Sequence, residues 1–201
     1  MSADVRPRVT LLLGGVRSGK SARALALAES LIQPKSNGPS ALFVATAQAF
    51  DDEMTRKIAA HRAERSATWT TLESPVEVPG DLTNALATGE KSHSVVVIDC
   101  VTLWVSNILL CLDETANAEV VVAERVRQLL SAFDHGRDCP RHFILVSNEV
   151  GLGVVPPTPL GRRFRDALGR ANQILAERAD EVILMVAGLA LELKSLPTDE
   201  R

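Results

Sequence analysis

The residues best suited to chemistry form a glycine-rich stretch, GGVRSGKS, from Gly14 to Ser21. It fits the pattern G-x-x-x-x-G-K-[S/T], in which backbone N–H groups around the glycines converge on phosphate oxygens. Lys20 would reach the outer phosphates, and the Ser21 hydroxyl could bind Mg²⁺. An accidental match is disfavoured, because the stretch follows an apolar run and precedes a helical pattern. The residues predicted to bind phosphate are Gly14, Gly15, Val16, Arg17, Ser18, Gly19, Lys20 and Ser21.

An acidic residue stands where a P-loop protein is expected to have a metal ligand. Asp99 directly follows the apolar run Val95–Ile98, which indicates a buried strand. A carboxylate at the carboxyl end of a strand near the phosphate loop can hold Mg²⁺ directly or through water. The alternative is an aspartate that only caps the next helix. With a phosphate loop in the same chain, we favour Asp99 as a magnesium ligand together with Ser21.

One histidine has neighbours that suit phosphate chemistry. A neutral imidazole at His61 is a competent nucleophile at phosphorus. The guanidinium groups of Arg62 and Arg65 would lower its pKa and neutralise charge on an attacked phosphate. From spacing alone, however, a histidine on the same helical face as Met54 and Ile58 is more often a packed residue than a catalytic one.

These residues must be positioned by apolar runs that alternate with helical patterns, which indicates an α/β sandwich around a mostly parallel sheet. The segment Ser74–Glu90 is either a loop or a weak helix. Strands are predicted at Val9–Leu13, Ala41–Ala45, Thr68–Leu72, Val95–Ile98, Phe143–Val146, Val182–Val186 and, at an edge, Leu189–Leu193. Helices are predicted at Ser21–Ile32, Asp51–Arg65, Val101–Leu112, Val122–Phe133 and Leu160–Arg178.

Length and composition limit the function. The 201 residues fit one domain, with an ordered core from about 9 to 194. A hydrophobic content of 46% is against disorder, and a net charge of −3 gives no basic face for nucleic acid. The three cysteines lack CxxC spacing, so we expect reduced thiols in a cytoplasmic protein rather than a disulfide framework or a zinc site. We also expect neither a signal peptide nor integral membrane association.

Several longer stretches are similar, in order and spacing, to one enzyme family. They are GGVRSGKS, FVATAQAFDDEM, IAAHRAER, WTTLESP, VVVIDCVTLWVSNIL, VSNEVGLGVVP and FRDALGRANQILAERADEV. Because of them the chain resembles, from about Val9 to Lys194, the bifunctional adenosylcobinamide kinase/adenosylcobinamide-phosphate guanylyltransferases of cobalamin biosynthesis. The T-A-Q segment, the histidine helix and SNEVGLGVVP are more specific signals than the phosphate loop, which very many enzymes share.

The resemblance implies two reactions at one site. ATP or GTP phosphorylates the terminal hydroxyl of the aminopropanol arm of adenosylcobinamide. GTP then donates GMP to adenosylcobinamide phosphate, which releases pyrophosphate and leaves adenosylcobinamide-GDP. In the family the second step passes through GMP bound covalently to a histidine, and the matching residue is His61. The resemblance also implies a Mg²⁺ cofactor, a RecA-like P-loop fold of three layers around a mostly parallel sheet, and a homo-oligomer, commonly a trimer.

The resemblance assigns nucleotide contacts to further residues. Glu73 matches an acid suited to the guanine edge, because a carboxylate can accept from the N1 and N2 hydrogens. Asp99 occupies a position where some relatives have glutamate. The loop Val150–Pro159 is a candidate for contact with the corrin ring. The other matched contacts are Thr46, Ala47, Gln48, Arg62, Ala63, Glu64 and Arg65.

Two other functions remain open at this point. A one-step P-loop kinase that acts on another small alcohol would form no covalent nucleotidyl intermediate with GTP. A nucleotide-binding regulatory module would bind ATP or GTP without consuming either when cobinamide is added. A Ras-like switch is disfavoured, because the sequence contains no N/T-K-x-D motif for guanine.

Overall fold

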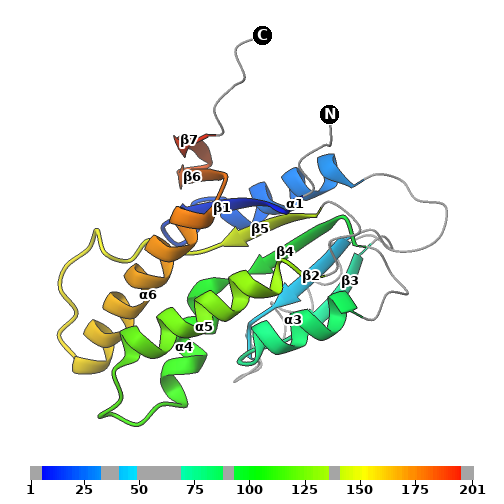
Figure 1. Cartoon of the computed structure of the whole chain (residues 1–201). Coiled ribbons are helices and arrows are strands. Elements are labelled where there is room, and N and C mark those ends of the chain that lie inside the picture. Colours follow the sequence, from blue (N-terminus) through cyan, green and yellow to red (C-terminus); the bar gives the residue numbers. More distant parts are fainter. Residues whose placement is uncertain (1–5, 33–40, 49–68, 88–92, 136–140, 196–201) are drawn as a thin grey trace.

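The alternating segments form a mixed sheet with helices packed on it in the computed structural model (Figure 1). The structure describes residues 6–32, 41–48, 69–87, 93–135 and 141–195. The strands are β1 (Arg8–Gly14), β2 (Ala41–Ala45), β3 (Trp69–Glu73), β4 (Val95–Asp99), β5 (His142–Val146), β6 (Glu181–Val186) and β7 (Leu189–Lys194). The helices are α1 (Lys20–Leu31), α3 (Val78–Ala87), α4 (Val101–Leu110), α5 (Ala118–Ala132) and α6 (Pro159–Arg178).

The sheet has seven strands in the order β3-β2-β4-β5-β1-β6-β7. All neighbours pair in parallel except β7, which runs antiparallel to β6. The continuous apolar run from Val95 to Ile98 is fully buried in β4, as expected for a parallel strand with both faces covered. The predicted α/β fold with a mostly parallel sheet is therefore confirmed.

The predicted elements differ from the observed ones mainly at helix ends. The segment Ser74–Glu90, which was predicted to be either a loop or a weak helix, contains the helix α3. The helix predicted from Val122 begins as α5 at Ala118, because the side chain of Asn117 accepts a hydrogen bond from the Val120 N–H at 3.2 Å and caps the first turn. The helix predicted at residues 51–65 lies outside the described residues.

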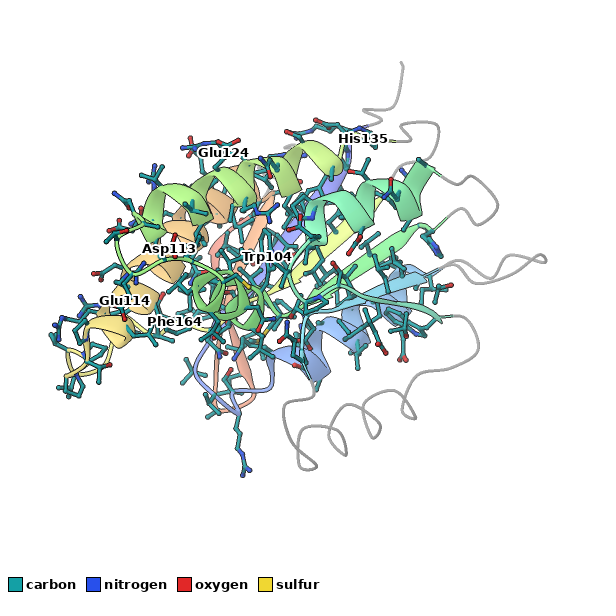
Figure 2. All side chains as sticks on the ribbon, turned by 90° about the horizontal axis from the view of Figure 1, so that it is seen from below. Trp104, Asp113, Glu114, Glu124, His135 and Phe164 are labelled. Carbon is teal, nitrogen blue, oxygen red and sulfur yellow. The ribbon has the colours of Figure 1, made fainter. Side chains whose placement is uncertain are left out.

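Helices pack on both faces of the sheet and give the predicted three layers. Helix α1 packs on one face against β1, β4 and β5, whereas α3 to α6 lie on the other face (Figure 1). Side chains of a strand alternate accordingly, so that Leu11 joins the core under α3 to α6 and Leu12 joins the core under α1. Trp104 of α4 is fully buried in the first of these cores (Figure 2). None of the described helices is long and apolar enough to cross a membrane.

The carboxyl ends of the parallel strands lie at one edge of the sheet, where ligands of open α/β sheets usually bind. Strand β1 ends at Gly14, β3 at Glu73 and β4 at Asp99. Thr46 directly follows β2. These four residues are far apart in the sequence and were predicted to contact nucleotide, and each ends or directly follows a strand at the same edge of the sheet.

The opposite edge of the sheet holds a partly buried polar cluster. Nε2 of His142 lies 2.8 Å from Oγ1 of Thr10, and this hydroxyl also donates to Glu181 at 3.0 Å. Burial, followed by the charge of Arg8, lowers the pKa of His142 to about 4. The folded chain therefore favours the neutral imidazole.

We expect the free energy of unfolding to decrease as the pH falls from about 6.5 to about 4. The pKa of His142 is about 4 in the folded chain against a usual value of 6.5. Protonation in this window therefore favours the unfolded chain, by at most about 1.4 kcal/mol per pH unit. Denaturant unfolding at a series of pH values measures this slope. In the variant His142→Asn the slope should lose the contribution of His142. An unchanged slope would show that other groups are responsible.

Candidate nucleotide-binding site

The turn after β1 has the backbone geometry of a phosphate-binding loop. Gly14 has a φ of 149°, and Gly19, the N-cap of α1, has a φ of 96°. A Cβ on Gly14 would lie 2.3 Å from the carbonyl oxygen of Met185 on β6, so only glycine fits there. Arg17 is also left-handed, with a φ of 59°. The turn leads directly into the N-terminus of α1, where backbone N–H groups and the helix dipole favour an anion.

Lys20 opens α1 with its side chain held inside the turn. The residue is 7% exposed, and its Nζ donates to the carbonyl oxygen of Gly15 at 2.6 Å and to Oγ of Ser18 at 3.3 Å. Burial lowers the pKa of Lys20, whereas nearby Cys100 and Asp99 raise it. These contacts keep the ammonium group at the mouth of the loop, where it can bind phosphate oxygens.

The hairpin between β6 and β7 supports the phosphate loop, a feature that sequence analysis missed. The N–H of Gly188 donates to the carbonyl oxygen of Ser18 at 3.0 Å. A Cβ on Gly19 would lie 3.4 Å from Cα of Gly188, so the hairpin also passes close to the start of α1. Ala187 and Gly188 have φ values of 52° and 83°. A dipeptide such as Ala-Gly between two apolar strands could have indicated this two-residue turn.

Asp99 lies at the end of β4, and β5 separates this strand from β1. Two strand spacings, about 10 Å, therefore lie between the backbones of β4 and β1. Asp99 nevertheless acts electrostatically on Lys20. The N-cap residue of α4 is Cys100 rather than Asp99, so the aspartate does not occupy the capping position that was its alternative role.

The two described cysteines are free thiols, and one of them is next to the predicted metal ligand. Burial, followed by the charge of Asp99, raises the pKa of Cys100 to about 11. A thiol with this pKa stays protonated near neutral pH and is a poor nucleophile. The backbone N–H and carbonyl oxygen of Cys100 are both bonded to the Thr46 side chain, which gives Cys100 a structural role beside Asp99.

Thr46 uses its hydroxyl within the protein. Oγ1 accepts a hydrogen bond from the Cys100 N–H and donates to the Cys100 carbonyl oxygen, both at 2.8 Å, and the residue is fully buried. Its own N–H donates to the carbonyl oxygen of Asp99 at 3.4 Å. Thr46 thus fixes the backbone around Asp99, and the half-buried Ala47 and Gln48 that follow it are the more accessible part of the T-A-Q segment.

Glu73 is the exposed last residue of β3 and pairs with Ala45 of β2 in the sheet register. Glu73 and Asp99 therefore end β3 and β4, and Gln48 lies three residues after the end of β2, the strand between them. His61 and residues 62–65 lie outside the described residues, and their assignments stay predictions.

A buried polar network fixes the loop after β5 beside the phosphate loop. Nδ2 of Asn172 on α6 donates to the carbonyl oxygen of Asn148 at 3.0 Å, and the Asn148 N–H donates to Oγ1 of Thr102 on α4 at 2.7 Å. The N–H of Glu149 donates to the carbonyl oxygen of Gly14 at 3.1 Å. Sequence analysis gave Thr102 and Asn172 no role, although a polar side chain inside an apolar helical stripe, such as Asn172, is a usable signal.

Ser21 and Asp99 fit a magnesium ion better than a transition metal. Within the described residues, no group of three or more His, Cys, Asp and Glu side chains could hold a metal ion. Mg²⁺ usually takes only one or two protein ligands and completes its shell with waters and substrate phosphates. A serine hydroxyl in the first turn of α1 and a half-buried carboxylate at the end of β4 are oxygen donors of the kind that Mg²⁺ prefers.

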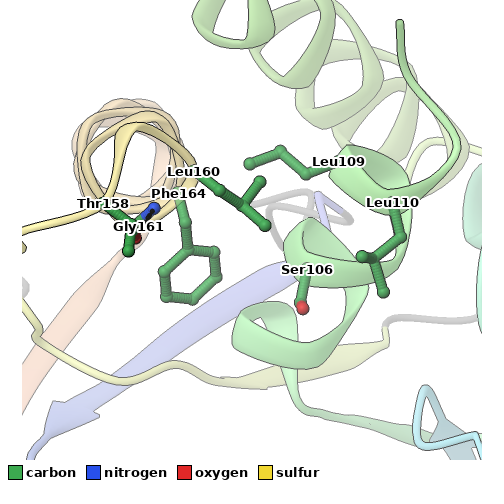
Figure 3. Close-up of a pocket in the computed structure, with 7 residues that line it drawn as sticks. All are labelled: Ser106, Leu109, Leu110, Thr158, Leu160, Gly161 and Phe164. Carbon is green, nitrogen blue, oxygen red and sulfur yellow. Dashed lines mark hydrogen bonds between the residues drawn. The ribbon is translucent and has the colours of Figure 1, made fainter. Parts of the chain in front are cut away.

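A separate apolar groove lies between the end of α4 and the start of α6 (Figure 3). Its volume is about 300 Å³, and its apolar walls include Leu109, Leu110, Leu160 and Phe164. None of the residues predicted to contact nucleotide lines it. We therefore assign this groove no part in phosphate chemistry.

A phosphate loop at the end of a central parallel strand, with a carboxylate at the end of a nearby strand, defines a P-loop nucleotide-binding protein. Residues 10–193 match the family model described as cobinamide kinase / cobinamide phosphate guanyltransferase. The chain belongs to this family, which confirms the resemblance found in the sequence.

Relatives of known name cover almost the whole chain. This chain is 43% identical over 187 residues to the bifunctional adenosylcobalamin biosynthesis protein CobP of Pseudomonas aeruginosa. The match covers 93% of this chain and 98% of the relative. It is 37% identical over 192 residues to the bifunctional adenosylcobalamin biosynthesis protein CobU of Salmonella typhimurium, and 37% identical over 193 residues to that of Escherichia coli K12. In both comparisons the match covers 92% of this chain and 98% of the relative.

We expect Gly14→Ala to abolish GTP binding, because its Cβ would approach the Met185 carbonyl oxygen to 2.3 Å and Ser18 Oγ to 2.7 Å. The free energy of unfolding should fall by about 2–4 kcal/mol. Gly15→Ala is the matched control, since nothing lies within 4 Å of its Cβ. Titration calorimetry with GTP and denaturant unfolding measure both effects. Equal binding by the two variants would contradict the close approach assigned to Gly14.

Proposed function

We propose that this chain catalyses both reactions of its family. It would phosphorylate adenosylcobinamide with ATP or GTP and then transfer GMP from GTP to adenosylcobinamide phosphate, which gives adenosylcobinamide-GDP. The observation that carries this proposal is the phosphate loop from Gly14 to Ser21, whose backbone turn has the required geometry in a chain matched by the family model over residues 10–193. Both reactions consume a nucleoside triphosphate, so one phosphate loop can serve both.

In the kinase step, the terminal hydroxyl of adenosylcobinamide attacks the γ phosphorus. The bond from that phosphorus to the β–γ bridging oxygen breaks, the nucleoside diphosphate leaves, and the hydroxyl gives up its proton. Lys20 and the N–H groups of the phosphate loop stabilise the charge on the β and γ oxygens. Ser21 and Asp99 would hold Mg²⁺, which supplies further positive charge to the phosphates when it is bound.

In the guanylyl step, we assign the nucleophile to His61. Its neutral imidazole attacks the α phosphorus of GTP, the bond to the α–β bridging oxygen breaks, and pyrophosphate leaves. A phosphate oxygen of adenosylcobinamide phosphate then attacks the same phosphorus and releases the imidazole. Arg62, Ala63, Glu64 and Arg65 would contact the nucleotide, and the two guanidinium groups suit its phosphates. The stretch IAAHRAER supports this assignment.

Guanine would be bound at the ends of β3 and β2. The exposed carboxylate of Glu73 can accept hydrogen bonds from both N1–H and N2–H of the base. Ala47 and Gln48 lie on the neighbouring strand end. Because the hydroxyl of Thr46 is bonded to Cys100, Thr46 would take part through its backbone.

The corrin ring would lie on the loop at residues 150–159. Leu152 and Val154 in this loop are 85% and 95% exposed. Glu149, directly before the loop, donates a hydrogen bond to the phosphate loop at Gly14. Exposed apolar side chains beside a nucleotide site suit a large macrocycle with apolar faces. We place both reactions in the cytoplasm and propose a homo-oligomer, with the trimer that the resemblance implies.

We expect Lys20→Ala to slow the kinase and the guanylyl steps alike, by about 100-fold or more, because both lose the same phosphate-binding charge. The two steps can be followed separately, as phosphorylation of adenosylcobinamide and as GMP transfer to adenosylcobinamide phosphate. Arg23→Ala, which removes an exposed cation from the same helix, is the control and should keep both rates. Full turnover of either step by Lys20→Ala would rule out a shared phosphate loop.

We expect His61→Ala to lose acid-labile labelling with GMP while much of the kinase step survives. Mass spectrometry after incubation with GTP detects the adduct, and His135→Ala, an exposed histidine after α5, is the control. Equal labelling of His61→Ala would refute the assigned nucleophile. A wild-type chain that phosphorylates cobinamide without any adduct would be a one-step kinase, and one that consumes no nucleotide would be a regulatory module.

A further inference from the structure

Helix α4 carries one buried amide among apolar residues. Asn107 is 5% exposed, and its Nδ2 donates two hydrogen bonds of 2.9 Å, one to the carbonyl oxygen of Thr46 and one to the carbonyl oxygen of Pro75. These carbonyls belong to different loops, the one after β2 and the one after β3. A single amide group therefore joins two segments that are far apart in the sequence.

The two joined loops carry the residues assigned to guanine. Thr46 directly precedes Ala47 and Gln48, and Pro75 lies two positions after Glu73. The backbone pairing of β2 and β3 ends where the Ser74 N–H donates to the Ala45 carbonyl oxygen at 2.9 Å. Beyond that point, among the described contacts, the side chain of Asn107 links the segments that follow the two strands.

A second side chain of α4 holds the same loop. Nε1 of Trp104 donates to the carbonyl oxygen of Val76 at 2.8 Å. Trp104 is fully buried in the core on this side of the sheet (Figure 2), so its bond ties the loop after β3 to the packed part of α4. Asn107 differs from Trp104 because it also reaches the loop after β2. Of these two side chains, only Asn107 links the loop after β2 to the loop after β3 and so sets the distance between them.

We propose that Asn107 is a positioning residue for guanine selection, because its amide fixes the segment Thr46–Gln48 relative to Glu73. The inference rests on the proposed function, in which Glu73 binds the guanine edge. Hydrogen bonds to a flat base tolerate errors of only about 0.5 Å, so the spacing of the two loops determines whether both can contact the base. Discrimination of this kind depends on a few hydrogen bonds that the wrong base cannot make.

The amide is the required chemical group at this position. A side-chain amide supplies two N–H donors, which matches the two carbonyl oxygens that it meets. A carboxylate of the same shape has no N–H and would face both carbonyl oxygens with like partial charge. Asn107→Asp therefore removes both bonds at nearly constant volume. Asn107→Ala removes them without a charge and serves if the aspartate variant does not fold.

The test compares GDP with IDP, because inosine lacks the 2-amino group and neither nucleotide can donate GMP with loss of pyrophosphate. Titration calorimetry gives the two Kd values for each variant. The wild type should bind GDP more tightly than IDP, and Asn107→Asp or Asn107→Ala should reduce the ratio of the two Kd values by at least about threefold, mainly through weaker GDP binding. If an Asn107 variant loses the preference for GDP but binds IDP as the wild type does, Asn107 has a positioning role. General damage to the site would weaken the binding of both nucleotides.

Two controls keep the outcomes distinct. Val105→Ala leaves a cavity in the same helix without touching either carbonyl, so it should lower the thermal midpoint and keep the GDP preference. Glu73→Ala should lose the preference outright. If Glu73→Ala loses the preference and the Asn107 variants keep it, the positioning role is wrong while the proposed guanine site stands. If Glu73→Ala keeps the preference, or if the wild type shows none, the proposed guanine contact itself fails, and the inference with it.

Discussion

The passage of the phosphate loop past strand β6 is the contact on which the nucleotide site depends. The chain leaves β1 at Gly14 so close to the Met185 carbonyl that no side chain can be placed there. This close passage sets the direction in which the loop turns and enters α1. The Gly188 N–H then binds the loop at Ser18 from the β6–β7 hairpin. The backbone donors for phosphate are thus held by a neighbouring strand and its turn rather than by the loop alone.

The rest of the site is built from loops tied together by buried polar side chains. Thr46 holds the backbone at Cys100, and Asn107 holds the loops after β2 and β3. Thr102 and Asn172 hold the loop after β5. Each of these bonds satisfies a backbone group where the sheet pairing has ended, and buried backbone groups without partners are costly. The same bonds that stabilise the fold therefore also set the geometry of the site.

Sequence patterns predicted those features whose causes are local. The phosphate loop follows from glycines and a lysine at fixed spacing, and the strands follow from short apolar runs. The resemblance to the family, carried by longer stretches, is confirmed by the family match over residues 10–193. The weakest predictions concerned ends of helices, because a single cap such as Asn117 moves the start of α5 by one turn.

By itself the sequence determined the alternation of strands and helices and the family, and it predicted which residues bind phosphate and metal. Only the tertiary structure decided which strands are neighbours, so only it could show β5 between β4 and β1, and Glu73 beside the end of β2. It also decided that the Thr46 hydroxyl is used internally and that Asn107 bridges two loops. The reason is physical: glycine spacing acts within one turn of chain, whereas a buried amide has a role only once the partners that it must satisfy have been brought to it by the folded sheet.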